Sequence, residues 1–132
     1  MGAFLCPLFE VNVSTFCIVV TTPPHQNQSA TVIELIKAIY EQGHNLNGVF
    51  LYQDAVLAAN TLTNMPSDEF NFIESLKKES KTLGFAIHLC ITAAEKRGLT
   101  DQQPSNIDPA FTISGLGEMV ELSNGADRVI QL

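Results

Sequence analysis

Three cysteines, Cys6, Cys17 and Cys90, are the residues of this chain best suited to nucleophilic chemistry. Their number is odd, no Cys-x-x-Cys pair occurs, and the three histidines are scattered along the sequence. Disulfide frameworks and zinc sites need paired or regularly spaced ligands. We therefore expect no disulfide scaffold and no metal site, and a cytoplasmic location in which thiols stay reduced.

Cys90 has the most informative position. It ends the apolar run GFAIHLC and is followed at once by ITAAEKRG, a short helical pattern that Gly98 stops. At a helix start, unpaired backbone N–H groups and the positive end of the helix dipole favour thiolate over thiol. A thiolate attacks sulfane sulfur, and the same field would stabilise a persulfide anion. We predict Cys90 as the catalytic residue; the alternative is a buried structural cysteine, the commoner fate of a free thiol.

Three other residues are weaker candidates. Cys17 stands inside an apolar run, which favours packing over reactivity. His88 precedes Cys90 by two residues and so shares its strand face, but at about 7 Å along the strand we favour a packed or hydrogen-bonded histidine over a general base. We expect Asp54 to cap a short helix rather than act as an acid. Whether His88 or Asp54 assists Cys90 stays open.

Apolar, β-branched runs alternate with helical patterns along the chain. Strands are predicted at residues 15–21, 46–52, 84–90 and 127–132, and helices at 30–42, 68–82, 91–97 and 115–123. Crossovers of this length allow parallel strands, whose sheet must be covered on both faces. We predict a three-layer α/β/α domain of flavodoxin-like type with a mainly parallel sheet of four to five strands. Sites in such sheets lie at the carboxyl ends of strands, where Cys90 falls.

The chain has 132 residues, enough for one domain. We expect residues 1–14 to be an N-terminal extension outside the core, and residues 15–132 to form the single domain. No apolar run approaches the ~18 residues of a membrane span. The net charge of −7 argues against direct binding of nucleic acid. The loop TPPHQNQS after the first predicted strand lacks glycine, which disfavours a nucleotide or flavin site, so no cofactor is expected.

Three segments resemble the DsrE-like sulfurtransferase family, most closely its TusD subunits. They are FLYQDAVLAANTLT at residues 50–63, FAIHLCITAAEKRGL at 85–99 and FTISGLGEMVELSNGADRVIQL at 111–132. The resemblance covers about residues 16–132. This sequence departs from the family pattern at Ala55, where glycine is frequent, and at Lys96-Arg97, where two arginines are common.

The resemblance implies a cytoplasmic dimer of heterotrimers with TusB- and TusC-like subunits. It implies that sulfur comes from a small TusA-like carrier, rests on Cys90 as a persulfide and passes to a TusE-like acceptor. The sulfur would end in the 2-thiouridine of tRNA wobble positions. Two alternatives are a DsrE-type subunit of dissimilatory sulfur oxidation and a non-catalytic interaction subunit of a sulfur-transfer complex.

Overall fold

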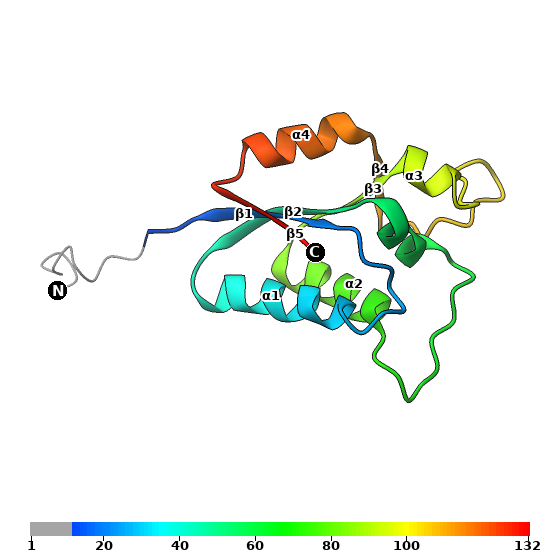
Figure 1. The fold of residues 1–132 in the computed structure, drawn as a ribbon, viewed down its shortest axis with the longest axis horizontal. Coiled ribbons are helices and arrows are strands. Elements are labelled where there is room, and N and C mark those ends of the chain that lie inside the picture. The colour runs from blue at the N-terminus through cyan, green and yellow to red at the C-terminus, as the bar shows by residue number, and fades with distance from the viewer. Residues whose placement is uncertain (1–11) are drawn as a thin grey trace, which may run out of the picture.

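The computed structural model describes residues 12–132, in which one five-stranded sheet has helices on both faces (Figure 1). The strands are β1 (Thr15–Val20), β2 (Asn45–Leu51), β3 (Ile87–Cys90), β4 (Thr112–Ser114) and β5 (Arg128–Gln131). The helices are α1 (Ser29–Glu41), α2 (Phe72–Leu83), α3 (Ile91–Glu95) and α4 (Leu116–Asn124), with a 3-10 helix, η3 (Gln53–Ala59), after β2. Most of the extension predicted at residues 1–14, including Cys6, lies outside the described residues, so that boundary stays a prediction.

All neighbouring strands are parallel, in the order β4-β3-β2-β1-β5. The chain adds β2, β3 and β4 outward from β1, and α4 then returns it across the sheet to β5 on the other side of β1. Helices α1 and α2 cover one face and α4 lies over the other (Figure 1). The predicted three-layer α/β/α class with a parallel sheet is confirmed. Its strand order differs from that of flavodoxin, in which β1 lies between β2 and β3.

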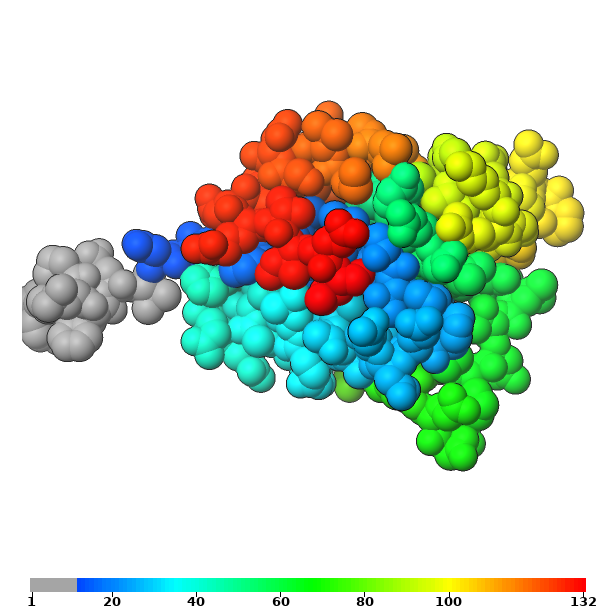
Figure 2. Space-filling view, in the orientation of Figure 1, coloured from blue at the N-terminus to red at the C-terminus, as the bar shows by residue number. Residues whose placement is uncertain are grey.

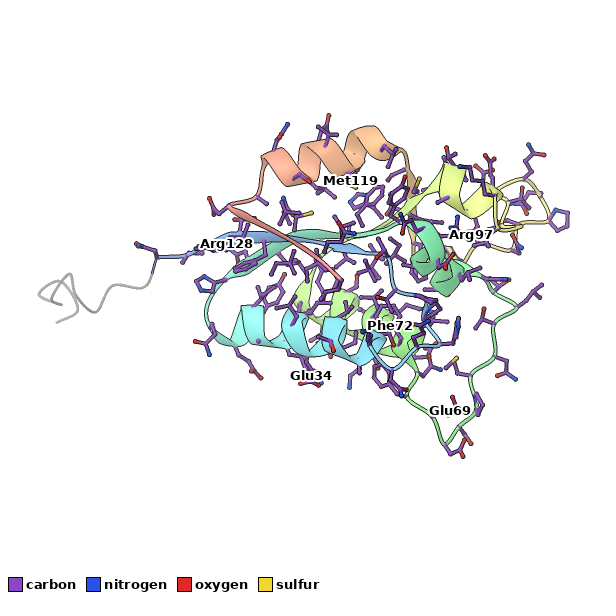
Figure 3. The ribbon with its side chains drawn as sticks, in the orientation of Figure 1. Glu34, Glu69, Phe72, Arg97, Met119 and Arg128 are labelled. Atoms are coloured by element: carbon purple, nitrogen blue, oxygen red, sulfur yellow. The ribbon has the colours of Figure 1, made fainter. Side chains whose placement is uncertain are left out.

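The core forms around the two central strands. The last four residues of β1 and of β2 are all buried, as expected of parallel strands covered on both faces. Helix α1 buries Val32, Ile36 and Ile39, whose spacing of three to four residues places them on one side of the helix. Phe72, at the start of α2, is fully buried beneath the sheet (Figure 3). Burial of this apolar surface is the main stabilising contribution to the fold.

The helices are short. The longest, α1, has 13 residues, and no helix within residues 12–132 is long and apolar enough to cross a membrane. Helix α2 begins four residues later than predicted, because the side chain of Asn71 caps it by accepting a bond of 3.1 Å from the Glu74 amide. It ends at Gly84, whose φ of +84° suits glycine. Strand β3 therefore starts at Ile87 and not at residue 84.

Strand β4 is absent from the sequence prediction. It has three residues, none of them buried, so it lacks the apolar run that marks a central strand. It nevertheless extends the sheet, because Thr112, Ile113 and Ser114 pair with the three residues of β3 that end at Cys90. The strand brings Ser114 alongside Cys90 at the carboxyl edge of the sheet.

A partly buried ion pair joins α2 to the loop before β4. Lys77 Nζ lies 2.8 Å from Asp108 Oδ2, and both side chains are less than one-third exposed. The hydrogen bond to Asp108 raises the pKa of Lys77. Burial alone would raise the pKa of Asp108, but bonds from Lys77 and the Ala110 amide, with the Lys77 charge, hold it below its ordinary 3.8.

We expect Asp108→Asn to destabilise the fold by about 1 kcal/mol near pH 7. A carboxyl whose folded pKa is lowered stabilises the native state above its unfolded pKa, and this contribution disappears as pH falls through the folded value. The difference between parent and variant should therefore shrink below about pH 4. Urea denaturation at several pH values measures it. A difference that stays constant from pH 7 to pH 3 would contradict this assignment.

Candidate functional site

Cys90 lies where the sequence predicts it, at the carboxyl edge of the sheet. It is the last residue of β3 and the N-cap of α3, with an extended backbone (φ −70°, ψ 113°). Its thiol is free and its side chain is only 1% exposed. Burial of this degree would fit a structural cysteine, so the surroundings of the thiol decide between the two interpretations.

A cavity of about 380 Å³ lies against Cys90. Its walls come from the segments that follow β2, β3 and β4, which are the carboxyl ends of adjacent parallel strands. The other lining residues are Tyr52, Gln53, Thr92, Ala93, Lys96, Arg97 and Leu116. The volume is within the range of small-ligand pockets, and Cys90 lines this space although the residue is almost entirely buried from bulk solvent.

Arg97 is fixed between α3 and η3 (Figure 3). Its Nε donates to Asp54 Oδ1 at 2.9 Å and its Nη1 donates to the Ala93 carbonyl at 3.0 Å. The second bond is typical of a basic side chain near the C-terminus of a helix, where it can bind one of the last carbonyl groups. The prediction for Asp54 is wrong: Tyr52 is the N-cap of η3, without a side-chain cap bond, and Asp54 binds Arg97 instead.

Gln53 is a lining residue that sequence reasoning did not find. It is the one non-glycine residue of the described chain with a positive φ, of 51°. Such a conformation is uncommon for a residue with a Cβ and is found more often near functional sites. No glycine or asparagine marks the position, so the sequence holds no signal for it. The turn determines where the following residue, Asp54, is placed.

His88 is hydrogen-bonded, as the sequence favours for a histidine two residues before Cys90. Its Nδ1 lies 3.0 Å from the Ser114 hydroxyl oxygen, which ties β3 to the edge strand β4. Within the described part of the chain, no hydrogen bond joins His88 to the thiol of Cys90. The geometry therefore makes His88 a support for β4 rather than a base for the cysteine.

Cys17 has a different environment. It is fully buried in β1, and burial raises the pKa of its thiol, an effect that a hydrogen bond with Ser123 of α4 partly offsets. A thiol in this state is a poor nucleophile near neutral pH, which agrees with the packing role predicted for it. Among residues 12–132, no three His, Cys, Asp or Glu side chains gather in a way that could hold a metal ion.

Comparisons with known proteins match this arrangement to one family. The model of the DsrE/DsrF-like family matches residues 14–132. The sulfurtransferase TusD of Pectobacterium carotovorum subsp. carotovorum (strain PC1) is 36% identical over 126 residues, which cover 89% of this chain and 98% of that protein. The crystal structure of the ychN protein from E. coli has a TM-score of 0.74 at 24% identity, covering 91% of this chain and all of the other, and shows the same fold. The chain belongs to the DsrE/DsrF-like family.

Proposed function

We propose that this chain is a sulfurtransferase subunit of the TusD type that accepts sulfane sulfur as a persulfide on Cys90. The observation that carries the proposal is the cavity beside this one strand-end thiol. The similarity to a protein named sulfurtransferase TusD supports the same reaction class. A purely structural cysteine would have apolar packing on all sides and would need no such space.

The proposed step needs no outside oxidant or reductant. The Cys90 thiolate attacks the outer sulfur of a carrier persulfide, forming a new S–S bond on Cys90. The S–S bond of the carrier breaks and its cysteine leaves as a thiolate. The outer sulfur and its proton move to Cys90, so atoms, charge and electrons balance. Onward transfer repeats the exchange, with the inner sulfur of Cys90 as the leaving group.

Burial suits this chemistry. A persulfide in open solvent loses its outer sulfur to any thiol that reaches it, whereas a group 1% exposed inside a cavity is shielded. Exclusion of competing reactants is a known benefit of enclosed active sites. The donor must then present its persulfide at the mouth of the cavity, so a partner protein with a protruding cysteine fits better than a small free thiol.

Partners follow from the same proposal. A TusA-like carrier would donate sulfur, TusB- and TusC-like subunits would complete a cytoplasmic heterohexamer, and a TusE-like protein would accept the sulfur for thiolation of tRNA wobble uridine. Helix α4 favours assembly, because it has no buried residue and exposes Leu116 and Val120 (44% and 53%). Figure 2 shows α4 and the last strand together at the surface of the molecule.

Intact-mass spectrometry tests the acceptor role. After incubation with a persulfide-loaded TusA-like carrier, the chain should gain the mass of one sulfur atom, and a reductant should remove it. The same carrier without persulfide is the control. A chain whose mass does not change, with or without TusB- and TusC-like subunits present, would contradict the proposed function.

A further inference from the structure

Arg97 has hydrogen-bonding capacity left over at the edge of the Cys90 cavity. A guanidinium group carries five N–H donors. The bonds to Asp54 and to the Ala93 carbonyl use two of them and hold the side chain in one orientation. Three N–H groups therefore remain, within the described part of the chain, for a ligand in the cavity that Arg97 lines. A guanidinium fixed in this way binds an anion at a smaller entropic cost than a free side chain would.

The charge around the cavity is opposite to that of the whole molecule. The chain has a net charge of −7 and only seven basic residues, yet two of them, Lys96 and Arg97, line the cavity that Cys90 also lines. Asp54 balances one of these charges. The cavity wall therefore keeps an excess positive charge beside a cysteine that is itself only 1% exposed to solvent.

Asp54 does not itself line the cavity. Its side chain is 59% exposed, while that of Arg97, which does line it, is 27% exposed. The carboxylate is connected to the cavity through its hydrogen bond with the guanidinium of Arg97. The left-handed conformation of Gln53 directly precedes Asp54 and sets its direction. A strained turn maintained at this position is consistent with a requirement for geometry rather than for stability.

We propose that Arg97 binds the anionic outer sulfur of the Cys90 persulfide and that Asp54 is the positioning residue that holds Arg97 in place. This inference rests on the proposed function and deepens it by assigning two residues to the same site. The competing explanation is an ordinary surface ion pair that joins η3 to α3. Such a pair would leave the charge preference of the cavity unchanged when its geometry is lost.

Two alkylating reagents of different charge separate these explanations. In the full-length protein, the rates at which iodoacetate (an anion) and iodoacetamide (neutral) modify the Cys90 peptide are measured by mass spectrometry, and their ratio is compared between variants. Changes in the nucleophile itself cancel in the ratio. Arg97→Met should lower it about fivefold, the size expected for loss of one nearby charge. Arg97→Lys keeps the charge and should stay within about twofold of the parent on the same grounds.

Lys37→Met is the matched control, because it also removes one positive charge, from the exposed side of α1 on the opposite face of the sheet. Its ratio should equal that of the parent. An equal loss in Lys37→Met and Arg97→Met would reduce the effect to net charge and overturn the proposal. An unchanged ratio in Arg97→Met, in a variant whose melting temperature shows that it is folded, would overturn it as well.

Asp54→Ala gives a test in which positioning of Arg97 by Asp54 and the effect of net charge alone predict opposite signs, whereas an ordinary surface ion pair predicts no change. The substitution removes a negative charge near the cavity, so net charge alone would speed reaction with iodoacetate. If Asp54 positions Arg97, the guanidinium moves away and the ratio falls instead, by about twofold or more. A raised or an unchanged ratio would overturn the positioning role. These readings do not depend on sulfur transfer, so failure of the proposed function, seen as absence of sulfur on the chain, is distinguishable from failure of this inference.

Discussion

Replacing Cys90 by serine is expected to abolish sulfur acceptance while leaving the fold intact. The substitution exchanges one atom at the junction of β3 and α3, where the side chain makes no cap bond that serine would lose. A hydroxyl cannot form a persulfide, so the loss should be complete rather than partial. Acceptance from a persulfide-loaded carrier, followed by intact mass, measures it, with circular dichroism to show that the variant is folded.

Cys17→Ser is the control for that experiment. It removes the other cysteine of the described chain, whose thiol is buried against α4 and has a raised pKa. Sulfur acceptance should be unchanged, although a hydroxyl buried in β1 costs about 1–3 kcal/mol of stability where it is incompletely paired. If Cys90→Ser still gained sulfur, or if Cys17→Ser lost it while folded, the assignment of the sulfur-carrying residue would be wrong.

The largest expected effect on stability comes from Phe50→Ala. Phe50 is fully buried near the carboxyl end of β2, a central strand, with Val19 of β1 beside it on one side and His88 of β3 on the other. Truncating such a side chain removes its burial and leaves a cavity, at a cost of about 3–5 kcal/mol. Since whole domains are stable by only about 5–15 kcal/mol, the melting temperature should fall by about 10–20 °C.

Phe70→Ala is a control of the same residue type at an exposed position. Phe70 is 42% exposed and stands just before α2, so its truncation should change the free energy of unfolding by less than about 1 kcal/mol. Calorimetry of the two variants gives the comparison. Equal losses in both would show that β2 does not lie at the centre of the core.

The sequence was sufficient to predict those strands and helices that are marked by a pattern of apolar residues. The continuous apolar runs of β1 and β2 and the apolar side of α1 each predict their own burial, and the alternation of strand and helix predicts a parallel sheet. The short polar strand β4 carries no such signal, because an edge strand has little apolar surface to bury. Its position depends on pairing with β3, a tertiary contact that no local pattern reveals.

The candidate site also has one part that local sequence patterns predict and another that only the tertiary fold reveals. The position of Cys90 follows from a strand run that meets a helical pattern, both of which are local. The residues around Cys90 come from distant parts of the sequence, since Arg97 bonds to Asp54 across 43 residues. The positive φ of Gln53 also has no sequence signal, because the position is not a glycine. Basic residues are common at the end of a helix, so Lys96 and Arg97 give no local signal of a site, and only the fold shows that both line the cavity.

The most direct test of the account is to locate the transferred sulfur in the unsubstituted chain. The full-length protein is incubated with a cysteine desulfurase, a TusA-like carrier and cysteine labelled with radioactive sulfur, then digested without reductant and mapped by peptide. The account predicts that the label lies on the peptide that contains Cys90 and that alkylation of the cavity thiol beforehand prevents labelling. Label on the peptide of Cys17 or of Cys6 would contradict it.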